Sequence, residues 1–287
     1  MAFLDEMDEK SGFLAADVTK TLGKDLYNRY NDNKPFPWIM IDDFLPNSIA
    51  QGMVDNFGPS NIGSDNLSFD RNQERFKASY HPDSLNTYAR GIFYAFNSRP
   101  FIRVIENITG ISGLIPDPYY LGAGFHEINN GGHLSVHADF NYHKPMNLER
   151  RINVLIYLND DWKEEFGGQL ELWNNDMTER CHSVVPSFNR CVIFNTTSDS
   201  MHGNPEIVRH PQGVSRKSIA LYYYTSTWDS TRKSHTTHFR ARPKTSDSTD
   251  WSVKLQEVRH DFIPPILLRN SARLGRLFEK MSSKFRV

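Results

Sequence analysis

The sequence predicts a mainly β protein with flanking helices, and three observations carry this prediction. Between residues 116 and 228, about eight short runs rich in β-branched and aromatic residues are separated by Gly, Asn and Pro. Two of these runs, 151–158 and 216–226, alternate between an apolar face and a mixed polar face. Upstream of residue 116, apolar residues recur at helical spacing. Short strands joined by turns are typical of a sandwich or jelly roll, whose apolar faces the helices would cover.

The region 1–115 is expected to support this β core. Ser48 fits the N-cap of a helix that carries Ile49, Met53 and Phe57 at four-residue spacing. Asp83 follows a proline and precedes an apolar stretch, so it is interpreted as the cap of a helix that ends near residue 97. The other expected elements are a short helix around 14–30, a β-rich run at 35–45, an Asn-, Ser- and Asp-rich loop at 59–75 and a short helix at 100–108.

The β core is expected to begin after Pro116. Its expected strands are 119–128, 133–139, 151–158, 168–173, 182–186, 190–194, 201–203 and 216–226. Residues rich in Ser, Thr, Asp and Lys then predict a polar linker at 229–251, and the chain ends in a predicted amphipathic helix at 266–284. We therefore expect a single domain over 1–228, with support at 1–115 and the core at 116–228, followed by a linker and helical extension over 229–287.

The alternation of residues within two strands indicates how the sheet is covered. In the first strand, one face is formed by Ile152, Val154, Ile156 and Leu158, and the other by Asn153, Leu155, Tyr157 and Asn159. In the second strand, Ile219, Leu221 and Tyr223 alternate with Arg216, Ser218, Ala220 and Tyr222. With helices packed on the apolar faces, the mixed faces would line an internal polar cavity.

The composition excludes several classes of protein. The formal net charge is −1 over 287 residues, so nothing in the overall charge favours nucleic acid. Cys181 and Cys191 are too few for a disulfide scaffold and indicate a reducing compartment. The N-terminus lacks the apolar core of a signal peptide, and no run of about 18 apolar residues predicts a membrane span. We expect a cytoplasmic protein with no nucleic-acid partner and no stable membrane insertion.

The stretch GGHLSVHADF, residues 131–140, places His137 and Asp139 two positions apart. Side chains at positions i and i+2 of a strand point to the same face, so an imidazole and a carboxylate would meet at one point and could bind a metal ion. An isolated H-x-D is more often a half-buried strand with a hydrogen-bonded histidine. His81 and Asp83 have the same spacing, but the expected cap position of Asp83 accounts for that pair.

A histidine from a later strand would complete a set of two imidazoles and one carboxylate. His202 is the preferred candidate because it follows the strand-like run CVIFN and precedes a Gly-Asn-Pro turn. His182, in an expected hairpin, and His210, beside a proline, are weaker candidates. A set of this kind leaves three adjacent positions open on an octahedral ion, which suits non-heme Fe(II).

The order of these motifs resembles that of the 2-oxoglutarate- and Fe(II)-dependent dioxygenases, in particular the prolyl-4-hydroxylase-like branch. The resemblance rests on His137-Ala-Asp139, on INVLIYLNDDWKEEFGGQLELWN, on His202 and on Arg216-Lys-Ser218. It implies that the core is a double-stranded β-helix, a cupin-like jelly roll, within a single catalytic domain. It also implies that His137, Asp139 and His202 hold Fe(II), which is used together with 2-oxoglutarate and O2.

The resemblance also implies where the co-substrate binds. Arg216 would bind the distal carboxylate of 2-oxoglutarate, because a dianion inside a barrel needs a fixed cation and a guanidinium can grip a carboxylate with two donors. Lys217 is the rival cation, but it shares the apolar face of its strand. Ser218 and Tyr157, on the inward faces, would add hydrogen bonds to that carboxylate.

The implied reaction is hydroxylation of an unactivated C–H bond, with release of succinate and CO2 and stimulation by ascorbate. The substrate would be a small metabolite or biosynthetic intermediate, or a prolyl residue of a peptide. The alternative is a non-catalytic jelly-roll module that binds a metal or a small acid, and turnover of 2-oxoglutarate separates the two readings. The basic amphipathic helix at 266–284 is expected to pack on its own domain or to form a homodimer.

Overall fold

The computed structural model describes residues 1–60, 66–227, 234–243, 245 and 247. The expected C-terminal helix at 266–284, and the homodimer contact assigned to it, lie outside these residues. Within the described part of the chain, no helix is both long and apolar enough to cross a bilayer.

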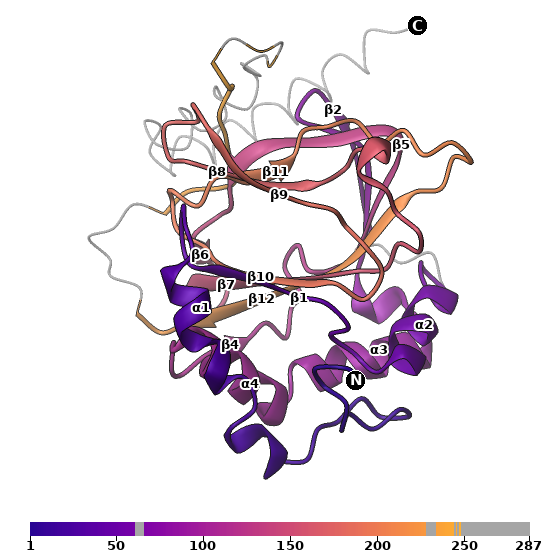
Figure 1. The fold of residues 1–287 in the computed structure, drawn as a ribbon, viewed down its shortest axis with the longest axis vertical. Coiled ribbons are helices and arrows are strands. Elements are labelled where there is room, and N and C mark those ends of the chain that lie inside the picture. The colour runs from indigo at the N-terminus through magenta and orange to yellow at the C-terminus, as the bar shows by residue number, and fades with distance from the viewer. Residues whose placement is uncertain (61–65, 228–233, 244, 246, 248–287) are drawn as a thin grey trace, which may run out of the picture. The chain divides into compact units, whose positions relative to one another are not determined.

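The described residues form a mainly β structure built on one curled, largely antiparallel sheet (Figure 1). Its main path follows the strand order β1-β10-β7-β12-β5-β11-β8-β9. The strands are β1 Trp38–Ile41, β2 Leu67–Arg71, β3 Glu74–Tyr80, β4 Ile115–Pro116, β5 Gly124–Ala138, β6 Tyr142–His143, β7 Leu148–Tyr157, β8 Leu170–Trp173, β9 Arg180–Val184, β10 Cys191–Asn195, β11 His202–Asn204, β12 Arg216–Thr225 and β13 His238–Phe239. The predicted mainly β class and jelly-roll core are confirmed.

One long strand, β5, closes the roll. Its first half pairs with β12 and its second half pairs with β11, so the two parts of the sheet face each other across the interior (Figure 1). The sequence predicts two strands here, but β5 runs through the double glycine without a break. Gly131 has φ 85°, and a Cβ on Gly132 would lie 2.5 Å from the carbonyl oxygen of Arg75. The pair therefore lets the strand bend where β3 approaches closely.

The helices lie against the outer face of the part of the sheet that contains β1, β10, β7 and β12 (Figure 1). They are α1 Tyr27–Asp32, α2 Asn47–Asp55, α3 Thr87–Phe96 and α4 Arg99–Thr109, with short 3-10 turns η1 Val18–Lys20, η2 Lys24–Leu26, η3 Pro82–Ser84 and η4 Glu164–Phe166. The helix α4 ends at Gly110, whose φ of 72° gives the left-handed C-terminal cap that glycine favours.

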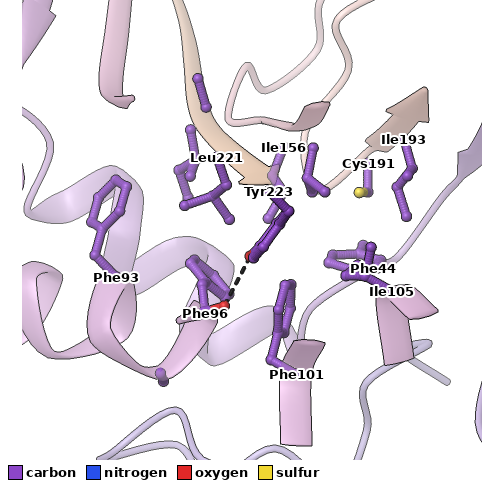
Figure 2. Close-up of a cluster of buried hydrophobic side chains, with 14 of the residues drawn as sticks. Phe44, Phe93, Phe96, Phe101, Ile105, Ile156, Cys191, Ile193, Leu221 and Tyr223 are labelled. Atoms are coloured by element: carbon purple, nitrogen blue, oxygen red, sulfur yellow. Dashed lines mark hydrogen bonds between the residues drawn. The ribbon is translucent and has the colours of Figure 1, made fainter. Parts of the chain in front are cut away.

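Aromatic and aliphatic side chains fill the layer between the helices and the sheet (Figure 2). The apolar face predicted for β7 belongs to this layer, and Ile156 is fully buried in it. Tyr223 of β12 donates its hydroxyl to the carbonyl of Phe96 at 2.8 Å, which ties α3 to the sheet. The other face of β7, with Tyr157, is turned away from the helices and toward the interior of the roll.

Several local predictions for the support region are wrong. The helix expected around 14–30 is split into η1, η2 and α1, and Gly23 with φ 87° interrupts it. Pro46, not Ser48, is the N-cap of α2. Asp83 lies in η3 and caps nothing, because the chain is extended again at Asn86, whose side chain accepts the Ala89 N–H and starts α3.

The loop expected at 59–75 is also wrong in its second half. There β2 and β3 form a hairpin, and β3 continues the sheet by pairing with β5. The hairpin is polar because its backbone, rather than an apolar side-chain stripe, joins it to the sheet. Composition alone therefore predicts a loop where tertiary pairing makes a strand.

Candidate active site

The pairing of β5 with β11 brings two histidines together. His137 lies directly opposite His202, and the two ring centroids are 4.6 Å apart. Directly opposite residues of an antiparallel pair share a face of the sheet, so the two rings point the same way. Phe239 of β13 lies opposite His137 on the other side of β5, and its ring is 5.2 Å from the imidazole.

Backbone carbonyl groups fix the position of the proton on both imidazoles. Nδ1 of His137 donates to the carbonyl of Ser135 at 2.8 Å, and Nδ1 of His202 donates to the carbonyl of Ser200 at 2.9 Å. Because a carbonyl only accepts, Nδ1 carries a proton in each ring, and in the neutral imidazole Nε2 is then the nitrogen that keeps a lone pair. Burial also lowers the pKa of His137, which favours the neutral ring. Both Nε2 atoms are therefore suited to bind a metal ion.

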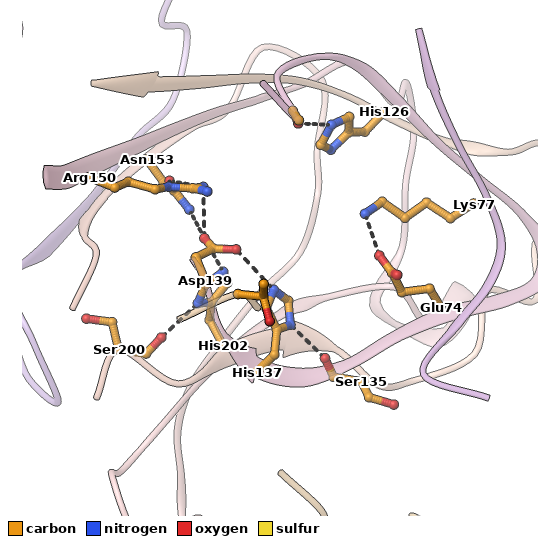
Figure 3. Close-up of polar contacts among 12 residues, drawn as sticks. Glu74, Lys77, His126, Ser135, His137, Asp139, Arg150, Asn153, Ser200 and His202 are labelled. Atoms are coloured by element: carbon orange, nitrogen blue, oxygen red, sulfur yellow. Dashed lines mark hydrogen bonds and ion pairs between the residues drawn. The ribbon is translucent and has the colours of Figure 1, made fainter. Parts of the chain in front are cut away.

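Asp139 brings a carboxylate to the same point (Figure 3). Its Oδ1 lies 3.4 Å from Nε2 of His137, and its Oδ2 lies 3.3 Å from Nε2 of His202. One ligand atom from each residue lies within 4.8 Å of the other two, and no second group of this kind occurs in the described part of the chain. Three lone-pair donors that converge in this way suit a bound cation.

The strand β7 holds Asp139 from behind. Arg150 Nη2 and Asn153 Nδ2 donate to its Oδ2 at 2.9 Å and 2.6 Å. The Arg150 guanidinium lies between two rings, 3.5 Å from the centroid of Tyr222 and 4.3 Å from that of Phe140. Burial alone would raise the pKa of Asp139, but the neighbouring Arg150 holds it well below its usual value. The carboxylate is thus ionised and held in one orientation.

A second buried arginine, Arg216, opens β12 and turns its side chain into the roll. It is 5% exposed, and its Nε donates to the carbonyl of Gly168 at 2.7 Å. Its guanidinium carbon lies 4.9 Å from the centroid of the Tyr157 ring. Burial lowers the pKa of Arg216, and only the Tyr157 hydroxyl opposes that effect, with no carboxylate among the described residues taking part. A buried charge without a counter-ion is costly, so this part of the interior suits an anion.

The other residues expected at the co-substrate site lie beside Arg216. Tyr157 and Ser218 are directly opposite each other on β7 and β12, and both are buried. The Tyr157 hydroxyl lies beside the Arg216 guanidinium but makes no hydrogen bond of normal geometry. Lys217 points the other way, and its Nζ lies 5.5 Å from the centroid of the Phe57 ring in the outer apolar layer. The structure therefore groups Arg216, Ser218 and Tyr157 and sets Lys217 apart from them.

A glycine pair lets Arg216 pack closely against the next segment of the chain. Gly168 has φ 72°, and a Cβ there would lie 3.0 Å from Cδ of Arg216. Gly167 has φ 73°, and its Cβ would lie 2.2 Å from the carbonyl oxygen of Ile207. Both positions need glycine for its backbone conformation and for its lack of a side chain, as expected of a tight turn.

The weaker histidine candidates lie elsewhere. His182 on β9 packs on the ring of Trp38 at 4.6 Å, and His210 packs on Trp162 at 5.3 Å. Neither contributes to the group formed by the two facing histidines and the aspartate. His81 accepts a hydrogen bond from the backbone of its own turn, so the other H-x-D pair is local.

The sequence analysis missed a polar wall that β3 contributes to the interior. Glu74 is 6% exposed, and it accepts hydrogen bonds from Lys77 Nζ at 3.0 Å and from Arg71 Nε at 2.9 Å. Burial alone would raise the pKa of Glu74, but these two cations hold it below its usual value. Lys77 lies opposite Ile128, which lies opposite Arg216 on its other side, so both cations share the inward face. Figure 3 shows Glu74 and Lys77 across from the triad.

Comparison with known proteins gives matches to the core of the chain. Residues 123–224 match the family model described as the 2OG-Fe(II) oxygenase superfamily. A segment of 79 residues is 32% identical to prolyl 3-hydroxylase OGFOD1 of Mus musculus. This segment covers 26% of the present chain and only 14% of the mouse protein.

Two solved structures are also similar. One is a prolyl hydroxylase from Trichoplax adhaerens in complex with a hypoxia inducible factor oxygen degradation domain peptide fragment, at 18% identity and a TM-score of 0.49. That match covers 70% of this chain and 88% of the other. The second is a prolyl-4-hydroxylase from Pseudomonas putida, at 16% identity and a TM-score of 0.44, which covers 70% of this chain and 98% of the other.

Proposed function

Residues 123–224 form a domain of the 2OG-Fe(II) oxygenase superfamily, and from this premise we propose that the chain is an Fe(II)- and 2-oxoglutarate-dependent hydroxylase. One observation carries the proposal: two complementary sites share the inside of one roll. The triad offers three converging lone-pair donors, and Arg216 offers a buried charge with no acidic partner among the described residues. A divalent ion fits the first and a carboxylate fits the second.

His137, Asp139 and His202 would hold the iron. Two imidazole nitrogens and one carboxylate oxygen are the donor set that leaves three positions for a bidentate co-substrate and O2. The lone pairs are already directed inward, because backbone carbonyls hold the protons on Nδ1. Arg150 and Asn153 keep the carboxylate turned toward the two histidines.

Arg216 would bind the distal carboxylate of 2-oxoglutarate, as the resemblance implies. Its guanidinium is held in place by Gly168 and by the ring of Tyr157, so little side-chain freedom remains to be lost on binding. The Tyr157 hydroxyl, which lies beside Arg216, would donate to the same carboxylate, and Ser218 lies within the same group. A guanidinium and a hydroxyl supply the donors that a buried carboxylate needs.

When bound, iron and 2-oxoglutarate supply the oxidative chemistry: O2 and 2-oxoglutarate are consumed, succinate and CO2 are released, and one oxygen atom enters a C–H bond of the substrate. The chain's own residues bind, orient and shield. Phe194 lies 4.7 Å from the His202 ring and Phe239 lies 5.2 Å from His137, so aromatic surfaces keep water from the two ligand nitrogens.

The substrate would be a small molecule or a prolyl residue of a peptide. The similarity of the core to prolyl hydroxylases supports the prolyl reading. The buried Glu74 and the half-buried Lys77 support a substrate with a polar group, since both face the interior of the roll. A cytoplasmic location, the absence of a nucleic-acid partner and a homodimer through 266–284 remain parts of the same proposal.

The test is production of succinate by the purified chain. With Fe(II), 2-oxoglutarate, ascorbate and O2, succinate should form only in the presence of iron, and His202→Ala should abolish it. His182→Ala is the matched control and should keep activity, because that ring lies outside the triad. A mass-spectrometric screen for the gain of one oxygen would then identify the substrate. Tight metal binding without succinate, alone or with any of the screened compounds, would favour the non-catalytic module.

A further inference from the structure

Asn204 presents a buried amide that the protein itself does not satisfy. The residue ends β11 and is 3% exposed. Its Nδ2 has no hydrogen-bond acceptor in the structure. Buried side-chain amides almost always find partners, because leaving a donor unpaired away from water costs free energy. An unpaired donor of this kind points to a ligand.

The strand pairing shows that Asn204 faces the interior. Two residues earlier on β11, His202 lies opposite His137, with its ring turned toward the triad. Asn204 lies opposite Leu134, and the register shifts between the two pairs because β5 has one extra residue there. The shift keeps Leu134 and Asn204 on the inward face, and Leu134 accordingly packs against a cluster that contains Ile128.

The same contacts place Asn204 between the triad and Arg216. On one side, it is two residues from His202. On the other side, its pairing partner Leu134 packs against the cluster of Ile128, which lies directly opposite Arg216. The chain beyond Asn204 also leads to this site, because the carbonyl of Glu206 accepts the N–H of Gly168, whose own carbonyl holds Arg216.

Other polar groups on this wall are already paired. Glu74 also lies opposite Leu134, on the far side of β5, but its carboxylate is taken by Lys77 and Arg71. The carboxylate of Asp139 is held by Arg150 and Asn153. Asn204 is therefore left with a buried donor that has no partner, on the inward face that also carries His202.

We propose that Asn204 donates a hydrogen bond from Nδ2 to the C1 carboxylate of 2-oxoglutarate and thereby orients its keto-acid end. The inference rests on the proposed function, since it assigns a residue to the co-substrate of that reaction. Arg216 would hold one end of the molecule and Asn204 the other. A site with both contacts would select 2-oxoglutarate over succinate, the shorter diacid that remains when C1 of 2-oxoglutarate is lost.

The experiment compares two ligands that differ at the proposed contact. Titration calorimetry under nitrogen, with Mn(II) in place of Fe(II), measures binding of 2-oxoglutarate and of succinate, which keeps a carboxylate for Arg216 but lacks C1. Asn204→Leu removes the donor and keeps the number and branching of the side-chain heavy atoms. It should weaken 2-oxoglutarate binding roughly ten- to hundred-fold, the usual value of a hydrogen bond to a charged group, and change succinate binding less than about two-fold.

Matched variants keep the result interpretable. Arg216→Gln should weaken both ligands, which separates the two ends of the site. Asn204→Asp, nearly identical in shape, should weaken 2-oxoglutarate binding further through charge repulsion, and it covers the case in which Asn204→Leu does not fold. Mn(II) affinity of Asn204→Leu in the absence of ligand should stay within about two-fold of the native value, because this variant changes no charge beside the triad.

Two results would overturn the assignment. Native 2-oxoglutarate affinity in Asn204→Leu or Asn204→Asp would show that the amide makes no such bond. Equal weakening of both ligands would show that Asn204 only shapes the cavity. If the native protein binds Mn(II) but neither ligand, the proposed function itself fails, and that outcome is distinct from the other two.

Discussion

Replacing Arg150 by Met should destabilise the metal-free protein strongly, and added metal should restore much of the loss. Arg150 is fully buried and lies 2.9 Å from the carboxylate of Asp139. Met keeps much of the side-chain volume but removes the charge and all of its donors. The carboxylate of Asp139 would then be left with Asn153 as its remaining donor outside the two triad histidines.

The expected loss in the free energy of unfolding is about 3–5 kcal/mol, the usual range when one partner of a buried ion pair is removed. The ring faces of Tyr222 and Phe140, 3.5 Å and 4.3 Å from the guanidinium carbon, favour the upper half of this range. Arg190→Met is the control, because Arg190 pairs with Asp42, whose side chain is 56% exposed. That variant should lose about 1 kcal/mol or less.

The assay is urea unfolding with and without saturating Mn(II). A divalent ion at the triad replaces the positive charge that the variant has lost, so Mn(II) should stabilise Arg150→Met more than it stabilises the native protein. A loss below about 1 kcal/mol in the metal-free state would refute the claim that Arg150 neutralises Asp139. An equal gain from Mn(II) in both proteins would show that the metal does not share the carboxylate with Arg150.

Three further predictions concern the interior of the roll. Arg216→Gln should raise the dissociation constant for 2-oxoglutarate by roughly one to two decades, whereas Lys217→Gln should leave it nearly unchanged; the reverse order would exchange the two cations. Tyr157→Phe should weaken 2-oxoglutarate binding with little change in the Tm, because the hydroxyl makes no hydrogen bond of normal geometry within the protein; a lower Tm with unchanged binding would contradict this. Burial, with Lys77 and Arg216 nearby, lowers the pKa of His126 to about 3, so the unfolded chain binds more protons than the native one between pH 3 and the usual pKa of histidine. Stability should therefore fall as the pH drops through this window, by up to about 1.4 kcal/mol per pH unit, and His126→Gln should flatten the slope in urea unfolding; an unchanged slope would count against it.

The fold was predictable where side-chain alternation carried the information. In β7, apolar and polar residues alternate because one face meets the helices and the other lines the roll, and the structure confirms both faces. In β12 the alternation holds less well, because Ala220 and Tyr222 of the expected mixed face belong to the same apolar cluster as Ile219, Leu221 and Tyr223. The hairpin of β2 and β3 was not predictable in this way. Its strands join the sheet through backbone hydrogen bonds, and its side chains face solvent or the charged interior, so no apolar alternation marks them.

The positions of the triad followed from strand geometry, whereas the residues that support it did not. The i, i+2 spacing of His137 and Asp139 and the later strand with His202 are visible in the sequence. No sequence pattern identifies Arg150 as a partner of Asp139, because the two residues come together only when the chain between β5 and β7 has folded. Asn153 was placed correctly on the inward face of its strand, but the sequence does not show that a carboxylate would lie beside it. The roles of these residues as ligands and supports stay predictions until metal binding is measured.

The two buried arginines differ in whether the protein itself neutralises their charge. Arg150 is compensated within the protein, with the carboxylate of Asp139 on one side and two aromatic faces around it. Arg216 is equally buried, yet its contacts are a single backbone carbonyl and the ring of Tyr157. An arginine without a counter-ion at this buried position does not stabilise the folded protein. An apolar residue of similar volume would avoid the free-energy cost of desolvating the charge. The cost is recovered only when an anion enters, so the imbalance itself locates the site of an acidic ligand. Since the same interior also carries three converging metal donors, the anion and the metal are best explained as two parts of one reacting complex.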